Sequence, residues 1–287
     1  MSAAPRVSVV VIVRDGERFL AEALESICAQ TFPLWEAIVV DDGSRDGSAA
    51  IAARFAEREP RRIRLLRHEG GANLGMSASR NLGIRAAHGE FVTFLDHDDC
   101  MEPSKLVAQV DALDGCSEAV AVIGPNLRWQ SWRGGAGADD VQDLGVPADR
   151  LLAAPGLLPV FLVRTSATPQ APMVRRSVID TIGGFEPEFR GMYEDQVFLA
   201  KLSAVGAVWI SSGVWQRYRQ HDESCVRVAH RGGRHIAARA RFLRWLAQWL
   251  AGAPLRDEER ARLQSIVRRE RRKLWWARLR LWMRLRR

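Results

Sequence analysis

Short apolar runs alternate with amphipathic segments along most of the chain. The runs are rich in Val and Ile, which is typical of strands buried on both faces, and the segments between them have apolar residues at helical spacing. The pattern predicts strands over residues 7–13, 37–40, 62–67, 91–95, 119–123, 208–210 and 214–218, and helices over residues 17–30, 46–57, 76–83, 103–113 and 194–202. This alternation predicts an α/β fold with a Rossmann-like, doubly wound, mostly parallel sheet and right-handed crossovers.

The run at residues 91–95 ends in three carboxylates, Asp96, Asp98 and Asp99. In open α/β sheets, ligands bind outside the carboxyl ends of the strands, so these side chains are expected at the mouth of a cleft. Three acids this close repel one another unless a positive charge is present. A divalent cation bound by carboxylates and substrate phosphates would supply that charge. The alternative for an isolated Asp-X-Asp is a solvated acidic turn.

Two further segments are candidates for chemistry. The Gly-rich loop at residues 70–75 leads into a helix that contains Arg80, and the N–H groups of that helix start, with Arg80, could bind a phosphate. Glu194 and Asp195 open a later helix, where acids also commonly complement the helix dipole. Residues 133–154 are rich in Gly, Ala and Asp without a strong period, which predicts either a mobile lid or a solvated insertion.

Charge divides the chain into two parts. The net charge is +8, but residues 227–287 hold 19 Lys and Arg against 4 Asp and Glu, so residues 1–226 are acidic. We therefore predict a catalytic domain over residues 1–226 and a basic helical tail over residues 227–287. The four cysteines have no metal or redox spacing and indicate reduced thiols in a cytosolic protein. We expect neither a signal peptide nor a membrane span.

The tail predicts two helices, over residues 233–251 and 257–285. In the second, one narrow stripe consists of Leu263, Val267, Leu274, Leu281 and Leu285, with Trp275 and Trp282 beside it and arginines on most other faces. Cationic amphipathic helices with Trp commonly lie at anionic membrane surfaces, which is the favoured interpretation. The alternative is that the stripe packs on the catalytic domain. Nucleic-acid binding is a poorer third choice, because no recognised binding motif accompanies the charge.

Taken in order, the motifs resemble those of family 2 glycosyltransferases, which have a GT-A fold. The resemblance covers residues 7–224, and the segments that carry it are residues 7–13, Asp41-Asp42-Gly43-Ser44, residues 73–83, residues 95–103, Gly183-Gly184-Phe185, Glu194-Asp195 and residues 218–221. Each motif alone is weak, but the ordered set is specific.

The resemblance implies a nucleoside-diphosphate-sugar donor, with a UDP-sugar as the expected type. The matching donor positions in this chain are Asp41, Asp42, Arg80, Asp96, Asp98 and His221. Of these, Asp96, Asp98 and His221 match the surroundings of the Mn²⁺ or Mg²⁺ that is held on the diphosphate. Asp195 matches the catalytic base that deprotonates the acceptor hydroxyl, with inversion at the anomeric carbon.

Two departures from the family pattern matter. The family often has Pro-X-Tyr-Asn after the first strand, where this chain has Ile12-Val13-Arg14-Asp15. We place Arg14 and Asp15 at the donor site, where a guanidinium can stack on a base in place of the aromatic ring. Processive members carry Gln-X-X-Arg-Trp, but here Gln220 stands at the Trp position. Together with the absence of predicted spans, this indicates a single-addition enzyme.

The sequence thus predicts an inverting, metal-dependent glycosyltransferase acting on a glycan or lipid-linked acceptor in envelope, capsule or lipid-linked glycan synthesis. Its expected location is cytoplasmic and peripheral on the inner face of the cell membrane, with an anionic membrane surface as partner of the tail and no nucleic acid. The alternatives are a nucleotidyltransferase, whose acidic metal site could look similar, and a catalytically silent membrane-associated scaffold.

Overall fold

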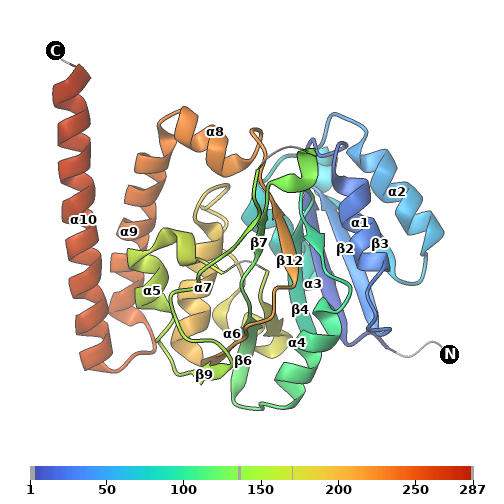
Figure 1. The fold of residues 1–287 in the computed structure, drawn as a ribbon, viewed down its shortest axis with the longest axis horizontal. Helices are drawn as coiled ribbons and strands as arrows, with labels where there is room; N and C mark the ends of the chain where they lie inside the picture. The colour runs from blue at the N-terminus through green and yellow to red at the C-terminus, as the bar shows by residue number, and fades with distance from the viewer. Residues whose placement is uncertain (1–3, 135–136, 170, 286–287) are drawn as a thin grey trace.

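A twisted eight-stranded sheet forms the centre of the molecule (Figure 1). The computed structural model describes residues 4–134, 137–169 and 171–285, with side chains of the last helix up to residue 276. The strand order is β3-β2-β1-β4-β10-β6-β11-β9. These strands are β1 (Val7–Val13), β2 (Trp35–Asp41), β3 (Ile63–Arg67), β4 (Phe91–Asp96), β6 (Ala119–Ile123), β9 (Arg150–Leu152), β10 (Met173–Arg175) and β11 (Ala207–Ile210). The predicted α/β class and mostly parallel sheet are confirmed.

Helices cover both faces of this sheet. They are α1 (Leu20–Cys28), α2 (Ser48–Arg58), α3 (Met76–Ala86), α4 (Lys105–Asp114), α5 (Leu158–Val163), α6 (Arg176–Ile182), α7 (Glu194–Val205), α8 (Cys225–Arg231), α9 (Arg234–Gly252) and α10 (Asp257–Leu285). Alternate residues of β1 enter two different cores: Val9 and Val11 pack with α1, α2 and α4, whereas Val10 packs with α3, α7 and α9. This two-sided burial explains why β1 is apolar throughout.

The sheet departs from a wholly parallel one at β10, which lies antiparallel between β4 and β6, and at its edge, where β9 is antiparallel to β11. A second, four-stranded sheet lies beside the first, in the order β5-β12-β7-β8, with β5 (Cys100–Met101), β7 (Leu127–Trp129), β8 (Asp140–Val141) and β12 (Gln216–Arg219). β12 pairs with β5, so residues 216–221 are held next to the carboxylates that follow β4. The segment expected as an irregular loop, residues 133–154, contributes β8 and β9.

The C-terminal helices belong to the same core as elements of residues 1–226. Phe242 and Leu246 of α9 and Leu263 and Val267 of α10 are buried in the cluster that also contains β1, α5 and α7. The boundary expected at residue 226 therefore does not separate two cores, and the packing alternative holds for this part of the predicted stripe. Leu281, Leu285 and Trp282 lie outside the described side chains.

No helix among the described residues has both the length and the apolar character that are needed to cross a membrane.

The buried stripe predicts a large stability effect for one α10 residue. Leu263→Ala is expected to lower the free energy of unfolding by about 2–5 kcal/mol, because it opens a cavity between α10 and the core. Arg262→Ala, the exposed neighbour, is expected to change it by no more than about 0.5 kcal/mol. Urea denaturation of both variants measures the difference, and equal midpoints would mean that α10 is not part of the core.

Candidate active site

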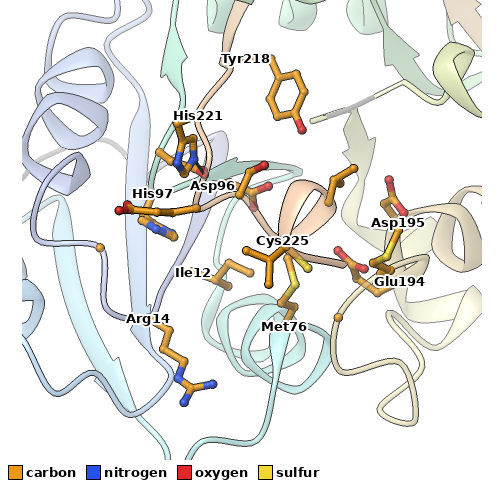
Figure 2. Close-up of a pocket in the computed structure, with 18 of the residues that line it drawn as sticks. Ile12, Arg14, Met76, Asp96, His97, Glu194, Asp195, Tyr218, His221 and Cys225 are labelled. Carbon is orange, nitrogen blue, oxygen red and sulfur yellow. Dashed lines mark hydrogen bonds and ion pairs between the residues drawn. The ribbon is translucent and has the colours of Figure 1, made fainter. Parts of the chain in front are cut away.

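A cleft of about 960 Å³ opens at the carboxyl ends of β1 and β4, where the predicted site lies. Figure 2 shows its two walls, with Asp96, His97 and His221 on one side and Glu194 and Asp195 on the other. The first wall comes from the β4 end and the segment after β12, and the second from the first turn of α7. Residues more than 90 positions apart in the chain thus face a common space.

The carboxylates after β4 divide into two roles. Asp96, Asp98 and Asp99 each offer an oxygen, and these three atoms lie within 4.8 Å of one another. Asp99 is buried and accepts hydrogen bonds from the Arg219 backbone N–H (2.9 Å) and from Gln216 Nε2 (3.1 Å). Burial, with repulsion from Asp98 and Asp96, raises the pKa of Asp99 well above its usual range. Asp99 therefore anchors the loop to β12, while Asp96 and Asp98 line the cleft.

His221 completes this wall. Its Nε2 lies 2.8 Å from Asp98 Oδ2, while its Nδ1 is buried with no hydrogen-bond partner among the described residues. Burial opposes ionisation of Asp98, but the hydrogen bond from His221 and the nearby His97 lower the pKa of Asp98 below its usual value. Carboxylate oxygens are the ligands that Mn²⁺ and Mg²⁺ prefer, so Asp96 and Asp98 are suited to such an ion. The expected ligand role of His221 stays a prediction, because its Nε2 contacts Asp98 and its Nδ1 is buried.

Arg80 contacts one acid of each wall. It is 6% exposed and donates from Nη2 to Asp96 Oδ1 (2.7 Å) and from Nη1 to Glu194 Oε1 (3.0 Å). Its guanidinium lies 5.3 Å from the ring centre of Phe185. The preceding Gly184 has a φ of +65°, and a Cβ there would meet Asn81 Oδ1 at 2.6 Å. The Gly-Gly-Phe motif thus forms the turn that brings an aromatic ring to Arg80.

The opposite wall begins with a strained residue. Tyr193 adopts a φ of +76° immediately before α7 and stacks on Phe242 of α9, with ring centres 5.3 Å apart. The turn presents Asp195 to the cleft and directs Glu194 to Arg80. Burial, reinforced by repulsion from Asp195, raises the pKa of Glu194 to about 8. Burial also raises the pKa of Asp195, although the hydrogen bond from the Gln196 N–H and the charge of Arg80 act to lower it.

A polar chain missed by the sequence analysis supports this wall. Arg239 of α9 donates to Gln196 Oε1 (3.3 Å), Gln196 Nε2 donates to Thr168 Oγ1 (3.0 Å), and the Thr168 carbonyl accepts from Gln142 Nε2 (2.7 Å). Gln142, Thr168 and Gln196 all line the cleft beside Asp195. Single Gln and Thr residues in loops carry no sequence signal, so only the fold reveals this group.

Comparison with known proteins agrees with this arrangement. Residues 8–134 match the family model described as Glycosyl transferase family 2. The chain carries a glycosyl transferase family 2 domain.

Similar sequences match this chain over only part of each protein. EpsE of Bacillus subtilis (strain 168), which is named a glycosyltransferase, is 37% identical over 114 residues. This match covers 40% of this chain and 40% of EpsE. Another of 97 residues is 40% identical to glycosyltransferase GlyA of Streptococcus pneumoniae serotype 4 and covers 34% of this chain and 13% of GlyA. The matched part thus spans less than half the length of these relatives.

Solved structures share the fold of this chain. S. aureus TarS 1-349 superposes with a TM-score of 0.70 over 92% of this chain and 71% of that one, at 19% identity. The mannosyltransferase PcManGT from Pyrobaculum calidifontis gives a TM-score of 0.58 over 94% and 70%, at 20% identity. The predicted GT-A fold with a C-terminal helical extension is confirmed.

The expected donor positions of the family 2 domain lie in different settings. Arg14, Asp15 and Asp42 line the cleft, whereas neither Asp41 nor Arg80 does so in the described structure. Asp41 is buried, accepts from the Ser44 N–H (2.9 Å) and pairs with Arg67 (3.2 Å). The assigned donor contacts stay predictions.

Asp42 holds the Gly-rich loop. Its carboxylate accepts hydrogen bonds from the N–H groups of Leu74 (2.7 Å) and Gly75 (3.0 Å) and from Asn73 Nδ2 (3.0 Å). The Met76 N–H at the start of α3 donates to the carbonyl of Arg190 (3.4 Å). Donors that the sequence suggested for phosphate binding are therefore partly engaged within the protein.

The position of Arg80 predicts a strong stability effect. Arg80→Ala is expected to lower the free energy of unfolding by about 3–5 kcal/mol, because it leaves Glu194 buried without its partner. Glu194→Gln in the same background is expected to recover part of the loss. Arg85→Ala, on the exposed side of the same helix, is the control. The assignment fails if urea denaturation shows equal effects for Arg80→Ala and Arg85→Ala.

Proposed function

We propose that this protein is an inverting, metal-dependent glycosyltransferase that moves a sugar from a nucleoside-diphosphate sugar to an acceptor hydroxyl. The observation that carries the proposal is the pair of opposed acidic walls, with Asp96 facing Asp195 across one cleft that Asp98 also lines. A displacement at an anomeric carbon needs charge compensation at the leaving group and a base on the other face of the sugar. The two walls have the chemistry for these two tasks.

The first wall suits the diphosphate. Asp96, Asp98 and His221 would hold a divalent cation there, and the chemistry that such an ion supplies when bound is neutralisation of the charge on the leaving diphosphate. Asp99 fixes the loop by its bonds to Gln216 and Arg219, so the ligands stay in place.

The second wall suits the acceptor. Asp195 would take the proton from the acceptor hydroxyl as that oxygen attacks the anomeric carbon, opposite the diphosphate. Its raised pKa makes it a stronger base than an exposed Asp. Glu194 lies beside it but accepts a hydrogen bond from Arg80, so we assign Glu194 a positioning role. The neutral polar groups of Gln142, Thr168 and Gln196 are suited to sugar hydroxyls.

Structural neighbours support the choice of donor. TarS has been solved in complex with UDP and with UDP-GlcNAc, and PcManGT with GDP-Man and Mn²⁺. A UDP-sugar is the proposed donor, and the proposed process is synthesis of envelope, capsule or lipid-linked glycan. Gln220 at the Trp position of the processive motif favours addition of a single sugar.

The proposed enzyme works at the cytoplasmic face of a membrane. Four free cysteines fit a reducing compartment. The basic part of α10 favours peripheral attachment to anionic lipid. Because Leu263 and Val267 are buried, the attachment would use the exposed side and end of the helix and not the stripe.

Release of nucleoside diphosphate, without pyrophosphate, from a panel of nucleotide sugars tests the reaction class. A nucleotidyltransferase would release pyrophosphate instead, and a silent scaffold would release neither.

Loss of a metal ligand gives the first test of roles. Asp98→Ala is expected to abolish turnover and to weaken Mn²⁺-dependent binding of UDP, since the diphosphate charge is then less compensated. Isothermal titration with and without a chelator measures the binding. Asp111→Ala, an exposed change on α4, is the control and is expected to behave as the wild type. Full activity of Asp98→Ala, or of the wild type in excess chelator, would exclude the metal assignment.

Replacement of the proposed base gives the second test of roles. Asp195→Asn is expected to lower kcat by about 10² to 10⁴ and to leave UDP affinity nearly unchanged. Because the pKa of Asp195 is raised, wild-type kcat should fall with decreasing pH in a limb above about 4, the ordinary pKa of Asp. The variant should lack that limb. Lost UDP affinity with normal turnover of bound donor would move Asp195 to the donor site.

A further inference from the structure

The charge of α10 is distributed along its length. Its first turn carries Asp257, Glu258 and Glu259, whereas residues 271–287 contain eight Lys and Arg and no Asp or Glu. Complementing the helix dipole accounts for cations in one last turn but not for the six Lys and Arg that residues 271–285 carry over about four turns of α10. In Figure 1 the C-terminal end of α10 lies at the same end of the molecule as α8, and its acidic start lies at the opposite end.

The helix α8 forms one lip of the cleft. Val226 and Val228 line the cleft and are 44% and 40% exposed. Behind them, Arg231 (2.9 Å), Arg227 (3.4 Å) and Arg133 (3.7 Å) all reach the carboxylate of Asp222. One carboxylate cannot use the donors of three guanidinium groups, and the cluster keeps an excess of positive charge. The lip therefore combines exposed apolar and cationic groups.

Two tryptophans add to this end. Trp275 and Trp276 are 57% and 53% exposed and contact each other edge to face, with ring centres 4.7 Å apart. They follow Arg271, Arg272 and Lys273 after one intervening Leu. Exposed Trp beside clustered cations matches the interface of an anionic bilayer, where the ring sits at headgroup level and each cation meets lipid phosphate.

We infer that the protein docks on an anionic bilayer with the end that carries the cleft mouth, through α8 and the C-terminal half of α10. Charge complementarity selects this occupant, since the surface offers many cations and aromatic or apolar groups. In this docking mode, which rests on the proposed function for the use of the cleft, the lip at Val226 and Val228 faces the lipid. The acceptor hydroxyl then reaches Asp195 from a molecule held in the membrane surface.

A fluorophore at each end of the molecule tests the orientation. Cys225 at the start of α8 is an exposed residue whose thiol lines the cleft mouth, and it takes a polarity-sensitive label once Cys28→Ser and Cys116→Ser remove the half-buried thiols. The control carries Glu118→Cys with Cys225→Ser. Since β6 runs in the same direction as β4, residue 118 before it lies at the end away from the cleft.

Vesicles of phosphatidylcholine with phosphatidylglycerol should shift the emission of the label at 225 to shorter wavelength and leave the label at 118 unchanged. Vesicles of phosphatidylcholine alone should shift neither. An equal shift at both positions, a larger shift at 118, or no shift at either would overturn the inference. Nucleoside diphosphate release without vesicles reports separately on the proposed sugar transfer, so its failure is distinguishable.

Paired variants test the surface. Arg227→Glu/Arg231→Glu and Trp275→Ala/Trp276→Ala are each expected to reduce co-sedimentation with these vesicles at least about tenfold, because one engaged cation is worth about fivefold in binding. Arg61→Glu/Arg85→Glu reverses the same charge at exposed sites before β3 and β4, and should leave binding within about threefold. Equal losses of vesicle binding in all three variants would contradict membrane docking. So would a wild type that binds no vesicles but self-associates, if the Trp variant loses that self-association.

Discussion

The site depends on one buried positive charge. A single cleft is lined by four carboxylates, those of Asp96, Asp98, Glu194 and Asp195. Neighbouring carboxylates repel one another or stay protonated unless a positive charge is close. Arg80 contacts one acid from each wall, at 2.7 Å and 3.0 Å, and so ties the end of β4 to the start of α7. Removing one partner of a buried pair costs far more than the pair contributes, so every acid here constrains the others. The guanidinium is kept in place by the ring of Phe185, which is positioned by the turn at Gly184 and by Asn81.

The C-terminal helices share in this constraint. Phe242 of α9 stacks on Tyr193 and holds the left-handed turn from which Asp195 enters the cleft, while Arg239 reaches Gln196, the residue after Asp195. Leu263 and Val267 of α10 support α9 from outside. The segment whose charge suggests a separate tail therefore has two sides: Leu263 and Val267 complete the core that contains β1 and α7, and Trp275 and Trp276 stay exposed.

The sequence predicts the parts whose signal is local. The apolar runs of β1 and β4 are long because both faces are buried, and the bounds of α10 follow from its stripe. The Asp-X-Asp lies in the cleft because strand ends in such sheets meet there. Three features needed long-range contacts and could not be predicted. β10 has three residues and is defined only by β4 and β6. The anchoring of Asp99 depends on β12, 117 residues away. Asp42 was expected at the donor, but its carboxylate is engaged by the 73–75 loop, and only the folded backbone shows that.

The central claim is that the two walls act on opposite faces of one sugar. Proton NMR of the sugar first released when water replaces the acceptor tests it most directly. With an α-configured UDP-sugar and Mn²⁺, the account predicts that the β anomer appears first and that the α anomer grows in only by mutarotation, since attack occurs opposite the diphosphate. The α anomer as first product would contradict the account, because it would require attack from the face of the leaving group and would leave Asp195 without its role.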